Sequence, residues 1–243
     1  MSGQTPAERL AWDSAFFGFE IGRAATEEMT PGTARALAAW AREHGVRCLY
    51  YLCAAADARS VRCAEREGYR LADVRVVFER ALPGDPIPDA PPGRIRPWRP
   101  DDLPALRAIA AGTLSGTRFH QDRGFPAGRA RALYEEWVTR SCDGFADAVF
   151  VVEQDGAAAG FVTCHLDGTR GRIGLIAVDA SAQGRQLGRL LIGAALRFFA
   201  QAGRASAEVA TQAHNVRAQR LYQRCGFLTA SVHLWYHRWF TER

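Results

Sequence analysis

The sequence predicts an α/β (α+β) protein in which a smaller N-terminal domain precedes a larger C-terminal one. Short apolar runs typical of buried strands alternate along the chain with amphipathic helical segments that end at glycine. Near the middle, residues 83–100 hold 7 of the 11 prolines. That composition favours an extended connector over the interior of an element. We therefore expect domains over residues 1–82 and 94–243, joined by a proline-rich linker over residues 83–93.

Composition narrows the class of protein. The chain has 243 residues, 48% of them hydrophobic, which is enough for a sizeable core. The net charge of +5 is spread without a basic block, so nothing supports nucleic-acid binding, while anionic ligands stay open. The six cysteines lack CxxC spacing and the N-terminus lacks a signal segment. We expect a cytoplasmic protein with reduced thiols, no metal site and no membrane span.

The first half shows clear element boundaries after an aromatic segment, residues 1–22, that we expect to be irregular. Thr30 precedes a proline at the start of a helical pattern, as an N-cap residue does. The expected elements are a helix over residues 31–44, a strand over 46–53, a helix over 59–67 and a strand over 71–81.

The second half alternates helices with strands. The polar, glycine-rich segment 112–128 is typical of a binding loop, and Asp155-Gly156 between apolar runs predicts a hairpin. The aromatic C-terminal strand has two open roles, pairing in a homodimer or packing on the first domain. The further expected elements are helices over residues 103–111 and 129–141, strands over 94–97, 148–153, 158–166 and 173–178, a long helix after residue 188, a strand, a short helix over 215–224, and a strand over 228–239.

The stretch 172–227 organises the second half. An apolar strand leads into the turn at residues 183–188, which opens a long helix. Glycines let backbone N–H groups approach a phosphate, and Arg185 and Arg189 add charge, so we interpret this turn as an anion site. The alternatives are an ordinary core strand and a plain helix start with surface arginines.

Two residues of the next helix are candidates for chemistry. Asn215 and Tyr222 lie seven positions apart and therefore share one face of the helix. Asn215 also suits a helix N-cap, and Tyr222 also suits a core aromatic. At a wet cofactor terminus, the phenol suits proton donation to a leaving thiolate.

The order of strand, loop of type Q/R-x-x-G-x-G/A, helix, strand and NVRAQRLYQRCGF (residues 215–227) resembles the GNAT (Gcn5-related N-acetyltransferase) superfamily over about residues 94–240. The resemblance implies a GNAT fold with a mixed central sheet, acetyl-CoA as acetyl donor, no metal, and direct attack of an amine on the thioester. One position departs, because Gln186 stands at the first glycine of the loop pattern. The implied acetyl-CoA contacts are Leu175, Ile176, Ala177, Val178, Gln183, Gly184, Arg185, Gln186, Leu187, Gly188, Arg189, Asn215 and Tyr222, the last as general acid.

A narrower resemblance covers nearly the whole chain. LAWDSAFFGFEIGR near the N-terminus, SGTRF, LYEEWV and WYHRWF are similar to the dTDP-fucosamine acetyltransferases of bacterial surface-polysaccharide synthesis. These enzymes acetylate the amino group of a nucleotide-linked 4-amino-4,6-dideoxy-sugar, which the resemblance implies as acceptor. Arg118 is then a candidate for a nucleotide phosphate, and Phe119 and Tyr134 are candidates for stacking. Asp73 is the candidate base, with an ordinary strand-end aspartate as the alternative.

Two histidines, His120 and His165, are of a residue type that can titrate near neutrality, but they belong to no motif. An internal similarity is more informative: residues 59–80 align without a gap on residues 217–238, so that Gly68 meets Gly226. The alternatives are a chance match of two αβ units and a partial GNAT copy in the first half.

Three functions therefore compete. The first is acetylation of a nucleotide-linked amino sugar. The second is a GNAT enzyme acting on another small amine or a protein N-terminus. The third, a non-catalytic acyl-CoA-binding module, is disfavoured because the loop and Tyr222 are both present.

Overall fold

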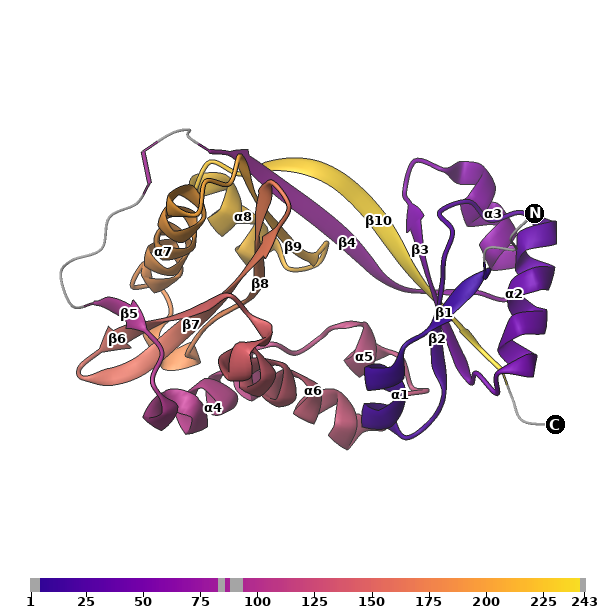
Figure 1. The fold of residues 1–243 in the computed structure, drawn as a ribbon, viewed down its shortest axis with the longest axis horizontal. Helices are drawn as coiled ribbons and strands as arrows, with labels where there is room; N and C mark the ends of the chain where they lie inside the picture. Colours follow the sequence, from indigo (N-terminus) through magenta and orange to yellow (C-terminus); the bar gives the residue numbers. More distant parts are fainter. Residues whose placement is uncertain (1–4, 83–85, 88–93, 241–243) are drawn as a thin grey trace.

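The computed structural model describes residues 5–82, 86–87 and 94–240. Within these residues, one mixed sheet has the strand order β1-β2-β3-β10-β4-β9-β8-β7-β6-β5, and Figure 1 shows it running the length of the molecule. The strands are β1 (Ala7–Arg9), β2 (Ile21–Ala24), β3 (Cys48–Ala54), β4 (Arg70–Ala81), β5 (Ile95–Pro97), β6 (Ala148–Gln154), β7 (Ala157–Asp167), β8 (Arg170–Val178), β9 (Ser206–Gln212) and β10 (Leu228–Trp239). The helices are α1 (Ala11–Phe17), α2 (Pro31–Glu43), α3 (Ala58–Arg66), α4 (Leu103–Thr113), α5 (Arg118–Gln121), α6 (Ala127–Arg140), α7 (Leu187–Gln201) and α8 (Val216–Arg224), with short turns η1 (Pro100–Asp102), η2 (Ser141–Phe145) and η3 (Ala180–Ala182).

The two halves of the chain interleave at the middle of the sheet. Strand β10 lies between β3 and β4, and β4 lies between β10 and β9, so that β4 and β10 cross the centre of the molecule side by side (Figure 1). The C-terminal strand therefore packs on the first half, one of its two open roles. The predicted mixed sheet is confirmed. The two-domain division stays a prediction, and most of the predicted linker, residues 83–93, lies outside the described residues.

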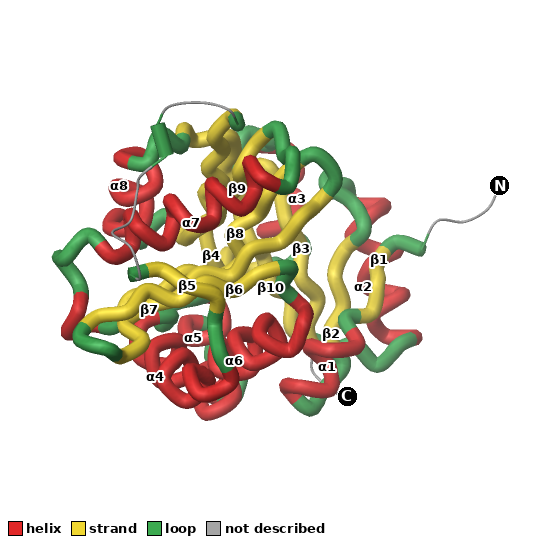
Figure 2. The backbone as a smooth tube through the Cα atoms, turned by 60° about the vertical axis from the view of Figure 1, so that its left-hand side comes forward, coloured by secondary structure: helices red, strands yellow, loops and turns green. Residues whose placement is uncertain are grey.

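Helices cover both faces of the sheet, as Figure 2 shows for α7 and α8 on one side and α4, α5 and α6 on the other. One core forms where α7 and α8 pack on β7–β9, with Leu191, Phe199 and Phe227 fully buried. A second core lies under α4 and α6 and includes Phe161 and Leu133. A third joins α2 and α3 to β3. Packing on both faces explains why the central strands are apolar runs without alternation.

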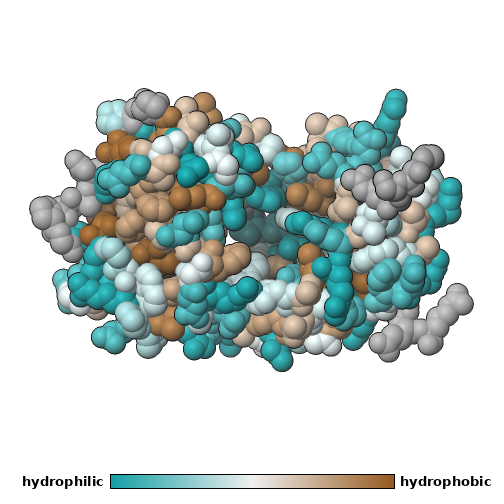
Figure 3. Space-filling model, in the orientation of Figure 1, coloured by the Kyte–Doolittle hydropathy of each residue, from teal (hydrophilic) through white to brown (hydrophobic). Residues whose placement is uncertain are grey.

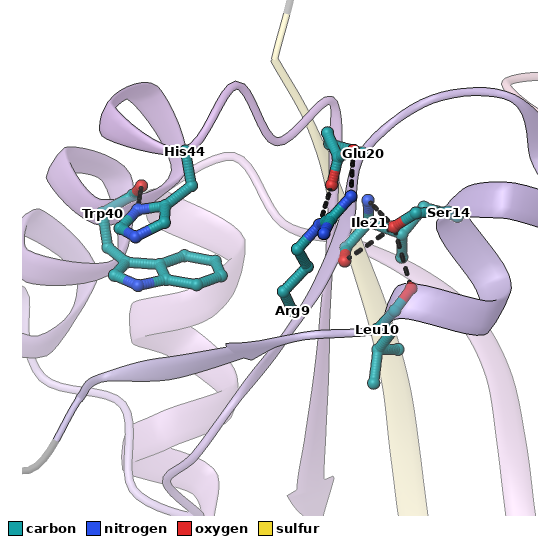
Figure 4. A network of polar contacts seen from close by, with 7 residues as sticks. All are labelled: Arg9, Leu10, Ser14, Glu20, Ile21, Trp40 and His44. Carbon is teal, nitrogen blue, oxygen red and sulfur yellow. Dashed lines mark hydrogen bonds and ion pairs between the residues drawn. The ribbon is translucent and has the colours of Figure 1, made fainter.

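The prediction of an irregular N-terminal segment is wrong, because residues 7–24 form strand, helix and strand. Figure 4 shows the polar contacts that stabilise this unit. The Ser14 hydroxyl donates to the Leu10 carbonyl at 2.8 Å and accepts from the Ile21 N–H at 2.9 Å, which ties α1 to β2. Arg9 and Glu20 form a two-pronged ion pair between β1 and the start of β2. These contacts link residues too far apart for a local pattern to show them.

Local signals elsewhere were accurate. The Thr30 side chain accepts from the Thr33 N–H at 3.1 Å and caps α2 as predicted. Asp155 and Gly156 take φ values of 54° and 78°, as a tight hairpin turn between β6 and β7 requires.

All six cysteines are free. No helix in the described ranges combines the length and apolarity needed to cross a membrane.

Candidate functional site

Strands β8 and β9 separate before they end. They pair in parallel from Arg170 with Ser206 to Ile173 with Val209, yet β8 continues to Val178 and β9 to Gln212. The strands therefore splay into a V beyond Ile173. The sequence left a core strand and a splayed strand open, and the structure shows the splayed one.

The far edge of β8 stays bound to β7, which fixes the direction of its backbone groups. The Leu175 N–H donates to the Thr163 hydroxyl at 2.8 Å, at an irregularity in the β7–β8 pairing. The Asp179 N–H likewise donates to β7. Because N–H groups alternate in direction along a strand, those of Ile176 and Val178 point into the V. The opening thus offers unpaired donors and acceptors to an extended, amide-bearing ligand.

The turn after β8 leads directly into the N-terminus of α7. Gly184 has φ 84° and Gln186, the N-cap, has φ 61°. No side chain caps this helix, so the first N–H groups of α7 lack intrahelical partners. Arg185 and Arg189 are exposed beside them. A helix N-terminus with open donors, a favourable dipole and two arginines suits a phosphate group.

Gln186 explains how the loop tolerates its departure from the family pattern. The residue adopts the left-handed conformation that glycine usually provides. A side chain there costs about 1–2 kcal/mol. The loop therefore takes a left-handed turn at this position although the residue is not glycine.

Gln183 and Gly188, two further predicted cofactor contacts, stabilise the packing of the loop and of α7 against α8. The Gln183 amide donates to the Val178 carbonyl at 3.0 Å and accepts from Arg217, which closes the turn against α8. A Cβ on Gly188 would stand 2.9 Å from Cδ2 of Leu221, so this glycine permits α7 to pack closely on α8. Their contacts to a cofactor stay predictions.

Asn215 caps α8. Its Oδ1 accepts from the Ala218 N–H at 3.1 Å and its Nδ2 donates to the Thr211 hydroxyl at 3.2 Å. The capping alternative is therefore present, and a role in binding pantetheine stays a prediction.

Tyr222 lies two turns further along α8, in the hydrophobic core that also contains Ile173 and Val209. Its side chain is 3% exposed, and its ring packs with centroids 5.7 Å from Phe78 and 6.2 Å from Phe227. Burial raises the pKa of the phenol well above its ordinary value. The group therefore holds its proton over the physiological range, as a general acid must.

A second group of predicted residues surrounds Arg118, the first residue of the short helix α5. Its guanidinium stacks 4.2 Å from the Trp235 ring and 4.3 Å from the rings of Tyr50 and Phe119. Phe119 is buried and supports the arginine from below. One nitrogen of Arg118 lies 3.0 Å from Nε2 of His237. Residues from β3, α5 and β10 thus meet at one cation.

Asp73 and Tyr134 face the same region. Tyr134 is buried, which raises the pKa of its phenol to about 12. Burial also raises the pKa of the Asp73 carboxyl, while the charges of His214 and Arg118 oppose that shift. The Ala213 N–H donates to the Val74 carbonyl at 2.8 Å, which places the end of β9 beside Asp73. The space-filling view is hollowed at its centre, between the two ends of the molecule (Figure 3).

The remaining histidine candidates differ in position. His165 is buried, and a Cβ on Gly174 would stand 2.5 Å from its Nε2, so it packs beneath the irregular part of β8. Burial lowers its pKa. His120 is exposed and stacks over Tyr134, with ring centroids 6.1 Å apart.

Among the residues of these sites that sequence reasoning missed are Thr163, His214, His237 and Asp122. His214 precedes the Asn215 cap, and Asp122 and His237 lie in a loop and a strand that were noted for other reasons. None has a local motif, because the partners of each are contributed by distant segments.

Comparisons with known proteins agree with this geometry. Residues 114–227 match the model of the acetyltransferase (GNAT) family. The chain is 28% identical over 235 residues to dTDP-fucosamine acetyltransferase of Escherichia coli O6:H1, covering 95% of this chain and 97% of that protein. It is 26% identical over 171 residues to the spore coat polysaccharide biosynthesis protein SpsD of Bacillus subtilis (strain 168), covering 67% of this chain and 57% of that protein.

A solved GCN5-related N-acetyltransferase from Sphaerobacter thermophilus shares the fold, with a TM-score of 0.65 at 18% identity over 90% of this chain and 72% of that one. The splayed strands, the uncapped helix after β8 and the matched segment point to the same conclusion. Residues 114–227 form an acetyltransferase (GNAT) domain, and the matched family and relatives support an acyl-CoA-dependent N-acetyltransferase.

Proposed function

We propose that this enzyme transfers the acetyl group of acetyl-CoA to the amino group of a nucleotide-linked 4-amino-4,6-dideoxy-sugar. The V between β8 and β9 carries the donor half of the proposal, since it presents unpaired backbone next to an open helix N-terminus. The similarity to dTDP-fucosamine acetyltransferase over nearly the whole chain supports the acceptor half.

The residues at the donor site fit acetyl-CoA. Backbone groups of Ile176 and Val178 hold the pantetheine arm and polarise the thioester carbonyl. The N-terminus of α7, with Arg185 and Arg189, holds the pyrophosphate. These assignments use only donors that face the opening or the solvent.

The reaction follows from the groups around the V. The neutral amine attacks the thioester carbon, a C–N bond forms and the C–S bond breaks. Tyr222 gives its proton to the leaving thiolate, and the proton lost by the nitrogen restores the balance through solvent. Asp73, with its raised pKa, accepts the proton of the incoming ammonium directly or through water.

The acceptor enters from the central region. Arg118 binds an anionic group of the nucleotide, and Tyr134 lines the path toward Asp73. The six free cysteines fit a reducing, cytoplasmic location, where acetyl-CoA is made.

The test is steady-state acetyl transfer to a panel of amines that includes dTDP- and UDP-linked 4-amino-4,6-dideoxyhexoses, free amino sugars, polyamines and peptide N-termini. We expect the highest kcat/KM for a nucleotide-linked amino sugar. If a simple amine or a peptide is the best substrate by tenfold or more, the proposed acceptor is wrong.

A further inference from the structure

The Arg118 guanidinium is unusual in its partners. It is half-buried and stacked on the rings of Tyr50, Phe119 and Trp235. Among the described residues no carboxylate oxygen lies within 4.0 Å of it, and its one hydrogen-bond partner there is Nε2 of His237. A guanidinium has five N–H donors. Most of its donors are therefore unused by the described residues, and its charge has no ion-pair partner within 4.0 Å, although it acts over a longer distance on the carboxyl groups of Asp13 and Asp73.

His237 is itself held in one orientation. It is 1% exposed, and its Nδ1 lies 2.6 Å from Oδ2 of Asp122. The same oxygen accepts from the Trp239 indole at 2.9 Å, and Oδ1 accepts from the Gly124 N–H at 2.9 Å. Asp122 is thus fixed by three donors.

These contacts set the tautomer of His237. Burial lowers its pKa to about 4, so the ring is neutral near pH 7. The carboxylate of Asp122 accepts, so Nδ1 carries the proton. Arg118 donates, so Nε2 is the acceptor. In both hydrogen bonds, Arg118 to Nε2 of His237 and Nδ1 of His237 to Asp122, a donor then faces an acceptor.

The hydrogen-bond acceptor that orients Arg118 is the neutral ring of His237. A carboxylate in the place of His237 would orient Arg118 equally well but would neutralise its charge. A neutral imidazole orients the guanidinium and leaves the charge available, while the aromatic rings cover its faces and leave its edges to a ligand.

We propose that His237 and Asp122 are positioning residues that hold Arg118 as an unneutralised cation for the diphosphate of the acceptor. The inference rests on the proposed function for the chemical class of the acceptor. The positioning of Arg118 explains which form of the acceptor the site selects, because a nucleoside diphosphate then binds here far better than the neutral nucleoside.

The test uses dTDP as the anionic probe and thymidine as its neutral match, with calorimetry on the wild type and two variants. His237→Leu removes the acceptor facing Arg118, and we expect it to weaken dTDP at least tenfold without changing thymidine. His237→Gln keeps a neutral side-chain oxygen, and we expect affinity within about threefold of the wild type. Unchanged acetyl-CoA binding shows that each variant is folded.

The tautomer gives a readout that does not depend on a variant. Nitrogen-15 NMR of the histidine-labelled wild type is expected to show a neutral His237 ring with the proton on Nδ1. A proton on Nε2, or dTDP affinity equal in the wild type and His237→Leu, overturns the inference and leaves the proposed function standing. A wild type that binds acetyl-CoA but neither dTDP nor UDP overturns both.

Discussion

Three consecutive elements of the first half match three of the second half at a constant offset of 158 residues. Adding this offset carries the N-cap Asp57 of α3 onto the N-cap Asn215 of α8, and both side chains accept from the helix they open. It also carries β3, α3 and β4 onto β9, α8 and β10 at both ends of each element. Gly68 and Gly226 end the helices with φ values of 82° and 80°. These coincidences support our proposal that the first half is a partial copy of the GNAT unit.

The halves differ where chemistry would occur. Helix α2 opens with the Thr30 cap and a proline, which has no N–H to offer, whereas α7 opens without a side-chain cap after a glycine turn. Ala64 stands where α8 has Tyr222. Three elements thus have the same backbone arrangement in both halves, and we propose that the start of α7 and the side chain of Tyr222 give only the second half the ability to bind and transfer an acetyl group.

The largest effect is expected at Tyr222. Tyr222→Phe removes the proposed acid and should lower kcat at least about 100-fold while the Kd for acetyl-CoA stays within twofold. Tyr236→Phe, which deletes a buried hydroxyl bonded to Glu65 in the first half, is the matched control and should leave kcat unchanged. Equal kcat values in the two variants would remove Tyr222 from the mechanism.

Asp73 tests whether the first half takes part in chemistry. Asp73→Asn should lower kcat/KM for the acceptor about tenfold or more at neutral pH. The base works deprotonated, so in the wild type the rate should fall as pH drops through the pKa of Asp73. Burial raises this pKa, and the charges of His214 and Arg118 partly oppose that shift. The variant should lose that acid limb. Glu79→Gln, on the same strand, is the control. An identical pH profile in Asp73→Asn would exclude this base.

Arg189 sharpens the contrast between the two helix entrances. Arg189→Ala should raise the KM for acetyl-CoA about fivefold, since one charge-assisted contact is lost, with kcat little changed. Arg35→Ala, on the exposed side of α2, should leave it unaltered. Steady-state kinetics at fixed acceptor decide the point, and equal KM values would place the pyrophosphate elsewhere.

The smallest effect concerns the backbone of the loop. Gln186→Gly relieves a left-handed non-glycine residue and should raise the free energy of unfolding by about 0.5–1 kcal/mol. Gly184→Ala introduces the opposite strain at φ 84° and should lower it by about 1 kcal/mol. Urea unfolding measures both. If both variants change the free energy of unfolding in the same direction, backbone strain at positive φ does not explain the effects of these substitutions.

Much of this molecule follows from local sequence. Thr30 before Pro31 fixes the start of α2, Asp155-Gly156 fixes the hairpin, and Gly226 fixes the end of α8, because each signal acts over a few residues of backbone. The GNAT-like sequence pattern also predicts the turn after β8. The partners of Gln183 and Asn215 could not be predicted, since each bonds atoms outside its own turn.

From the sequence alone it was therefore possible to determine the order of most elements, many of their ends and the presence of a GNAT-type segment. Only the tertiary structure decided that β8 and β9 splay, that β4 and β10 interleave the halves, and that Asp122, His237 and Arg118 form one chain of contacts. The physical reason is range: capping and turn geometry are set within a few residues, whereas strand pairing and the surroundings of a buried cation depend on segments more than a hundred residues apart along the chain.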